Sequence, residues 1–124
     1  MQIEIRQGLP FVTTTVTHQG KSLTLSNTLL DTGSAATIFS ADALLTIGIQ
    51  LEPQDTIHQV RGVGGTEFVF AKTIDKIAVG SLQVDAFEIE VGAMEYGFDL
   101  QGIIGLDFLI QVGAQIDLGT FQIR

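Results

Sequence analysis

The chain has 124 residues, of which 45% are hydrophobic, and a net charge of −8. This length suits one domain with its own core. The acidic surplus argues against nucleic acids and anionic membranes as partners, because both attract basic proteins. With no cysteine, the chain has no disulfide, no thiolate zinc site and no cysteine nucleophile.

Neither end of the chain nor its apolar stretches suggest a membrane protein. The opening MQIEIRQGLP lacks the basic and apolar regions of a signal peptide. The apolar-rich stretch 102–116 is interrupted by Asp107, Gln111 and glycines, which argues against a membrane span. We therefore expect a soluble, cytoplasmic protein, or the soluble part of a longer one.

The first half of the chain predicts two strands and a helix. Apolar and polar residues alternate through 10–30 on both sides of a turn at 18–20, which is typical of a hairpin. A short helix is expected over 40–48, because Ser40 can cap its start and Gly48 can end it.

The second half predicts further hairpins. Residues 56–71 contain two alternating runs around a glycine-rich tip at 62–65, and residues 73–91 form a second pair around a Gly-Ser turn. A brief helix at 106–110 and two short strands within 114–123 follow. Mostly strands with one or two short helices predict a mainly β fold, a closed or partly closed barrel.

Asp31 is the strongest candidate for chemistry. It follows two leucines directly, so we expect a carboxylate where a strand ends inside the core. Such a group is costly to bury unless it is hydrogen-bonded. Gly33 lets backbone N–H groups approach it, and the hydroxyls of Thr32 and Ser34 can donate to it. An ordinary Asx turn explains the tripeptide taken alone equally well.

Two further motifs follow the Asp31 motif along the chain. Apolar-apolar-Asp-Thr-Gly-Ser at 29–34, the glycine-rich hairpin at 62–65 and Ile-Ile-Gly at 103–105 occur in this order. This arrangement closely resembles the retropepsin-like aspartic proteases, single-domain relatives of pepsin, over nearly the whole chain. The resemblance implies one retropepsin-like domain over 1–124, with the closed barrel of an acid protease, that hydrolyses peptide bonds.

The resemblance also implies roles for the residues of the first motif. Asp31 is the expected catalytic aspartate. Thr32 is expected to hydrogen-bond across a two-fold axis and hold paired loops together. Gly33 lets the substrate backbone pass close by, and Ser34 is expected to bond the outer oxygen of the carboxylate.

The resemblance also implies that the motifs at 62–65 and 103–105 lie around the loop of Asp31. A flap that closes over a bound peptide is expected from four residues: Gly62, Val63, Gly64 and Gly65. Support of the active-site loop from behind is expected from three: Ile103, Ile104 and Gly105.

The chemistry needs two carboxylates that share a proton, and the chain has one Asp-Thr-Gly. Asp107 and Asp117 lack the Thr-Gly that follows Asp31. The partner is therefore expected to be Asp31 of a second copy, which makes the protein a homodimer acting on a peptide or protein substrate.

The sequence departs from the retroviral members beside these motifs. They carry acidic residues at the positions of Ala35 and Ala36 and an arginine at the position of Leu106. Both ends of an ion pair are thus missing together, which suggests replacement by apolar packing. This keeps open an alternative function, a catalytically weak or inactive dimerisation or peptide-binding module of the same fold.

Other site types are disfavoured. The glycines at 62–65 are not followed by the Lys-Ser/Thr of a phosphate-binding loop. His18 and His58 are too far apart in the chain for a typical metal motif, so no metal or cofactor is expected. Ser34 lacks the Gly-x-Ser-x-Gly elbow of a serine hydrolase.

Overall fold

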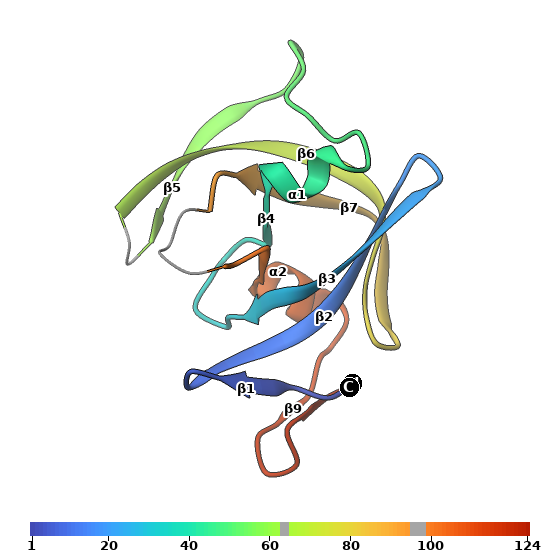
Figure 1. Ribbon diagram of the computed structural model, residues 1–124, viewed down its shortest axis with the longest axis vertical. Helices are drawn as coiled ribbons and strands as arrows, with labels where there is room; N and C mark the ends of the chain where they lie inside the picture. The colour runs from blue at the N-terminus through green and yellow to red at the C-terminus, as the bar shows by residue number, and fades with distance from the viewer. Residues whose placement is uncertain (63–64, 95–98) are drawn as a thin grey trace.

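The computed structural model describes residues 1–62, 65–94 and 99–124 (Figure 1). The strands of the main sheet are β1 (Glu4–Arg6), β2 (Leu9–His18), β3 (Lys21–Leu30), β4 (Ile38–Ser40), β5 (Ile57–Gly62), β6 (Gly65–Val79), β7 (Leu82–Gly92) and β8 (Gly102–Ile104). The helices are α1 (Ala41–Leu45) and α2 (Leu106–Gln111), and a small second sheet contains β9 (Ile116–Asp117) and β10 (Gln122–Ile123).

The main sheet closes on itself. Its strand order is β1-β2-β3-β8-β4-β7-β6-β5, and β2 also pairs with β6, so the strands from β2 to β6 in that order form a ring. Inside the ring lies a core in which Val16, Ile74 and Ile89 are fully buried. Phe108 of α2 joins this core, and its ring stands edge-on to that of Phe87, with 6.0 Å between the ring centroids. The prediction of a mainly β closed barrel with two short helices is confirmed.

The predicted hairpin over 10–30 is confirmed as β2 and β3. Gln19 and Gly20 at its turn both have positive φ, 50° and 80°, which matches the right-handed twist of a strand pair. The ladder shifts register between Val12 and Thr14. Thr14 lies on the same inward face of β2 as Val12 and Val16, and its hydroxyl pairs with that of Thr28 at 2.8 Å.

The predicted helices are present, and the predicted ends of the first are nearly right. The Ser40 side chain accepts a hydrogen bond from the N–H of Ala43 at 3.4 Å and so caps α1. α1 itself ends at Leu45, and the chain then turns through Gly48, whose φ is 79°. The second helix, α2, starts directly after Gly105.

The segment between α1 and β5 is tied to the barrel by one lysine. Lys72 of β6 contacts Glu52 at 2.5 Å and Asp55 at 2.9 Å. The hydrogen bond from Lys72 is the main reason why the pKa of both carboxyl groups lies below its ordinary value. Burial alone would lower the pKa of Lys72, but the bonds to its two partners raise it overall.

In the described ranges, no helix has the length and apolar character needed to cross a membrane.

Candidate active site

Parallel pairing of β3 with β8 positions Asp31. Leu29 lies opposite Ile103 and Leu30 opposite Ile104, so the two strands end together. The N–H of Asp31 then donates to the carbonyl oxygen of Ile104 at 3.0 Å. The predicted neighbours of Asp31 from the Ile-Ile-Gly motif thus lie beside it, although they are more than seventy residues away in sequence.

The loop after β3 begins with a turn around the carboxylate. The N–H of Gly33 donates to Oδ1 of Asp31 at 2.9 Å, and the N–H of Ser34 donates to the backbone carbonyl oxygen of Asp31 at 3.1 Å. Asp31 is half-buried, whereas Thr32 and Gly33 are exposed. The Asx turn is therefore real, and it holds the Asp31 side chain at the surface of the single chain, not deep in its core as the sequence suggested.

Ser34 makes a different contact from the one expected. Its hydroxyl donates to the carbonyl oxygen of Ala36 at 2.7 Å. A hydroxyl carries one hydrogen, so in this arrangement Ser34 has none left for the carboxylate of Asp31. Its role here is to close the turn at 34–36, and the expected bond to Asp31 is not made.

Gly105 lies in close contact with this turn. A Cβ at Gly105 would approach the carbonyl oxygens of Ala36 to 2.4 Å and of Ser34 to 2.8 Å. The next residue, Leu106, donates its N–H to the carbonyl of Ser34 at 2.8 Å. A side chain at 105 would push this turn away, so glycine is required by space at this position.

A second brace behind the loop joins Thr37 to Asp107. The Asp107 carboxylate accepts from the N–H of Thr37 at 3.1 Å, from its hydroxyl at 2.7 Å and from the N–H of Phe108 at 2.8 Å. The Thr37 hydroxyl in turn accepts from the N–H of Gly105 at 3.0 Å. Thr37 is fully buried.

Sequence reasoning missed this brace. It considered Asp107 only as a second catalytic aspartate and left Thr37 unassigned. A usable signal was present, because an acidic residue in the first turn of a helix interacts favourably with the N–H groups there. In the structure this carboxylate binds the loop that follows Asp31.

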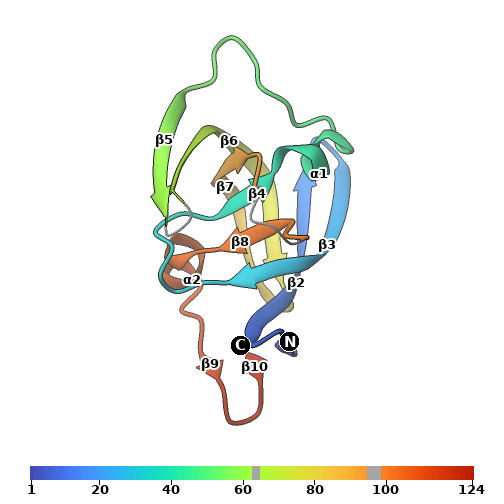
Figure 2. The same ribbon diagram turned by 60° about the vertical axis from the view of Figure 1, so that its left-hand side comes forward.

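The hairpin of β5 and β6 extends over the same side of the barrel. Gly62 and Gly65 lie opposite each other at its end, and Val63 and Gly64 lie outside the described residues. Figures 1 and 2 both show this end of the hairpin on the side of the loop that follows β3. Glu67 of β6 also binds the N–H of Met94 at 2.8 Å, which links the hairpin to the chain after β7.

An apolar cluster, separate from the barrel core, lies between these elements. Its buried members are Phe11, Ile38, Met94, Leu100 and Ile103. Leu29, Ala36 and Val60 pack against it, so the cluster reaches from the strand before Asp31 to the hairpin. Leu29, two residues before Asp31, and Ala36, at the end of its loop, connect the Asp31 loop to this cluster.

Of the three positions where the sequence departs from the retroviral pattern, Ala36 packs against the apolar cluster and the other two are exposed. Ala35 is exposed, and Leu106 remains 37% exposed.

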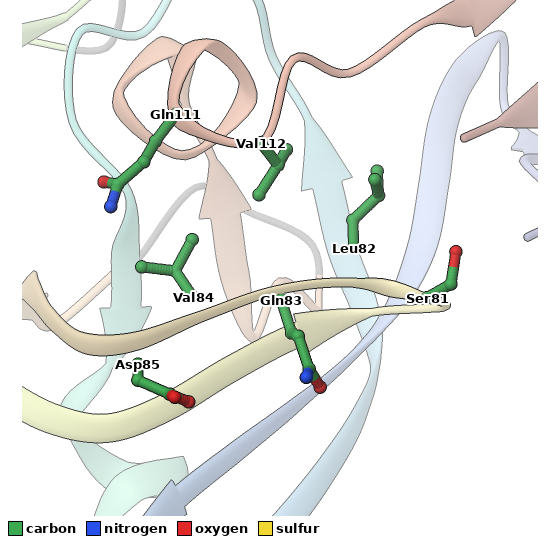
Figure 3. A pocket seen from close by; sticks show the side chains of 7 residues that line it. All are labelled: Ser81, Leu82, Gln83, Val84, Asp85, Gln111 and Val112. Carbon is green, nitrogen blue, oxygen red and sulfur yellow. The ribbon is translucent and has the colours of Figure 1, made fainter.

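A surface pocket of about 430 Å³ lies away from this loop, between β7 and the end of α2 (Figure 3). The side chains of Leu82, Val84 and Val112 point into it, whereas Gln83 and Asp85 point to the other side of the strand. Because the only carboxylate among its lining residues faces away, this pocket does not suit acid–base catalysis.

Each histidine lies near a carboxylate. His58 contacts Glu90 at 2.8 Å and His18 lies 3.9 Å from Asp75. Within the described part of the chain, no three acidic, histidine or cysteine side chains form a group suited to a metal ion.

Comparison with known proteins agrees with the geometry. A family model described as "Aspartyl protease" matches residues 14–108, a range that includes Asp31, its loop and the brace at Asp107. No curated protein matches the chain.

Proposed function

The chain belongs to the aspartyl protease family, and from that premise we propose that it is an endopeptidase of the two-aspartate type. The observation that carries the proposal is the setting of Asp31. Its carboxylate lies in an exposed turn at the end of β3, and the loop that follows is braced by Thr37 and Asp107. This is a site for an extended, largely apolar peptide segment whose backbone reaches the carboxylate.

The reaction requires a second carboxylate, which we assign to Asp31 of a second copy. The ionised member of the pair takes a proton from a water molecule, whose oxygen attacks the scissile carbonyl carbon. The protonated member hydrogen-bonds the carbonyl oxygen and stabilises its developing charge. Collapse of the tetrahedral intermediate breaks the C–N bond, and the nitrogen leaves with a proton from the pair.

The remaining residues of the chain orient these groups. The N–H of Gly33 fixes one oxygen of Asp31 and so sets the direction of the other. Thr32 is exposed at the tip of the turn, in a position to bind the matching loop of the second copy. We assign the end of the β5–β6 hairpin, at Gly62 and Gly65, to the flap that covers the peptide.

Mixing wild-type and Asp31→Asn chains tests the proposal. Wild type should cut a denatured protein substrate between about pH 4 and 7 and be inhibited by pepstatin, and Asp31→Asn should be inactive with an unchanged melting temperature. Asp85→Asn, at a remote exposed carboxylate, is the matched control. After equal amounts of wild type and Asp31→Asn exchange subunits, about one quarter of the dimers contain two aspartates.

The residual activity then distinguishes the mechanisms. About one quarter of the wild-type activity is expected if both copies contribute Asp31, and about one half if each chain acts alone. Activity that survives Asp31→Asn would refute the assignment. An inactive wild-type dimer that still binds peptides would support the alternative, a binding module, for which the exposed Ala35 and Leu106 are the motivating observations.

A further inference from the structure

One histidine links the β5–β6 hairpin to the wall of the barrel. His58 lies on β5 opposite Val69 of β6, and its Nε2 lies 2.8 Å from Oε1 of Glu90 on β7. A carboxylate only accepts hydrogen bonds, so the imidazole is the donor in this pair. Since β6 lies between β5 and β7 in the sheet, the contact ties the outer strand of the hairpin to the barrel across an intervening strand.

This pair lies on the face of the sheet that carries the apolar cluster. Glu90 lies beside Ile38 of β4, which is a buried member of that cluster. Val60, two residues after His58 and therefore on the same face of β5, packs against the cluster as well. The pair is thus on the side of the sheet where the cluster connects the Asp31 loop to the hairpin.

Glu90 also contacts the Asp31 loop through its backbone. Its N–H donates to the carbonyl oxygen of Thr37 at 2.9 Å. Thr37 is the residue whose hydroxyl binds Asp107 and Gly105 in the brace behind the loop. Glu90 therefore binds the hairpin with its side chain and the brace with its main chain.

The carboxylate of Glu90 has a donor at one oxygen and lacks one at the other. Its side chain is 15% exposed, and Oε2 is buried without a hydrogen-bond partner in the described part of the chain. A carboxylate in such a setting is costly to bury unless a donor or a cation offsets its charge. His58 can supply both, because an imidazole still donates a hydrogen bond when neutral and carries a positive charge when protonated.

Carboxylates are the other charged groups that the neighbouring strands place beside this pair. Glu67 of β6 and Glu88 of β7 share its face, two residues along from the positions next to it. Lys72 lies on the opposite face, since it pairs with the core residue Ile89, and the three residues of β4 are uncharged. Among the described side chains, His58 is thus the one base beside Glu90 on this face.

We propose that His58 and Glu90 are positioning residues that couple the hairpin to the Asp31 loop, and that protonation of His58 tightens this coupling. A charged donor bonds a carboxylate more strongly than a neutral one. The hairpin is therefore held most firmly in acid, and the hold weakens as the pH rises through the range of about 5 to 8 in which imidazoles lose their proton.

The inference rests on the proposed function, which assigns the end of this hairpin to cover the bound peptide. A hairpin already held in place costs less free energy to order when the peptide binds. The pair thus adds a reason, separate from the aspartates, why peptides should bind more tightly in acid.

Two variants of the pair and a matched control test this coupling. Glu90→Gln keeps the shape of the side chain and removes its charge. His58→Lys keeps a positive charge at and above neutral pH, and its longer side chain can reach the same carboxylate. His18→Gln is the control at the other histidine, 3.9 Å from Asp75 and on the other side of the barrel from β5 (Figure 1). KM and kcat are measured with one peptide at about pH 5 and about pH 7.5.

At the lower pH, the KM of wild type and of His18→Gln should be about threefold lower than that of Glu90→Gln, with kcat the same in all of them. At the higher pH this difference in KM should disappear, whereas His58→Lys should keep the low KM at both. If Glu90→Gln has the KM of wild type at the lower pH, or if His18→Gln has lost the low KM, the pair does not position the hairpin.

A measurement without catalysis separates this inference from the endopeptidase. In Asp31→Asn protein, the backbone N–H signal of Thr37 in NMR spectra should move with pH at the same midpoint as the imidazole signals of His58. Adding Glu90→Gln should abolish that movement. A Thr37 signal that does not follow His58 would refute the coupling, whether or not wild type cuts peptides. Coupled signals in a protein whose wild type cuts no substrate would uphold the coupling and refute the endopeptidase.

Discussion

Replacing Thr37 by valine tests the brace that holds the Asp31 loop. Valine has nearly the shape of threonine but lacks the hydroxyl, which donates to Oδ1 of Asp107 at 2.7 Å and accepts from the N–H of Gly105 at 3.0 Å. Thr37 is fully buried, so water does not replace either partner without a structural change. The substitution therefore leaves a buried N–H unpaired and removes one of three donors to a carboxylate.

The size of the effect follows from these two losses. A hydrogen bond to a charged group contributes about 1.5–3 kcal/mol, and an unpaired buried donor costs about 1–3 kcal/mol. Because the loop relaxes in part, we expect a total loss of about 3 kcal/mol. In a domain of this length that loss lowers the melting temperature by roughly 10 °C.

Urea unfolding and thermal melting of three variants measure this loss of stability. Thr37→Ser keeps the hydroxyl and loses a methyl group, so it should lose only about 1 kcal/mol. Thr15→Val is the control at a half-buried threonine on the other face of β2, whose hydroxyl lies 3.4 Å from that of Thr24, and should change stability by no more than about 0.5 kcal/mol. If Thr37→Val is as stable as Thr37→Ser, the hydroxyl does not brace the loop and the reasoning fails.

Two other contacts give further predictions. Gly105→Ala puts a Cβ 2.4 Å from the carbonyl oxygen of Ala36, and since backbone must move, urea unfolding should show a loss of at least about 2 kcal/mol; unchanged stability would contradict this packing. Lys72→Met removes the cation that lowers the pKa of Glu52 and Asp55. Wild type should therefore lose unfolding free energy more steeply than Lys72→Met as the pH falls below about 4, and equal slopes would contradict the pairing.

The long hairpins could be predicted from the sequence because each carries its own signal. Alternating side chains and a glycine turn are local, and both are visible in the segments that became β2 with β3 and β6 with β7. The short strands β4 and β8 have no such signal. Three residues show no period, and their pairing depends on β3 and β7, which come from elsewhere in the chain.

The sequence predicts the turn at Asp31 but not all of the bonds that hold its loop. Asp31 and its Gly33 contact follow from a local turn. Ser34 has a choice of acceptors within reach, and which one it takes depends on where the carbonyl of Ala36 lies, which the close approach of Gly105 helps to fix. Asp107 meets Thr37 across seventy residues of sequence, so no local pattern shows the pairing.

The brace has a consequence for how a dimer would form. The loop that carries Asp31 is fixed within one chain by Gly105, Thr37 and Asp107. Association that has to order loops costs free energy for each side chain and segment it immobilises. In this chain the loop is already ordered within one copy, so the proposed pairing of two Asp31 carboxylates would not have to order it.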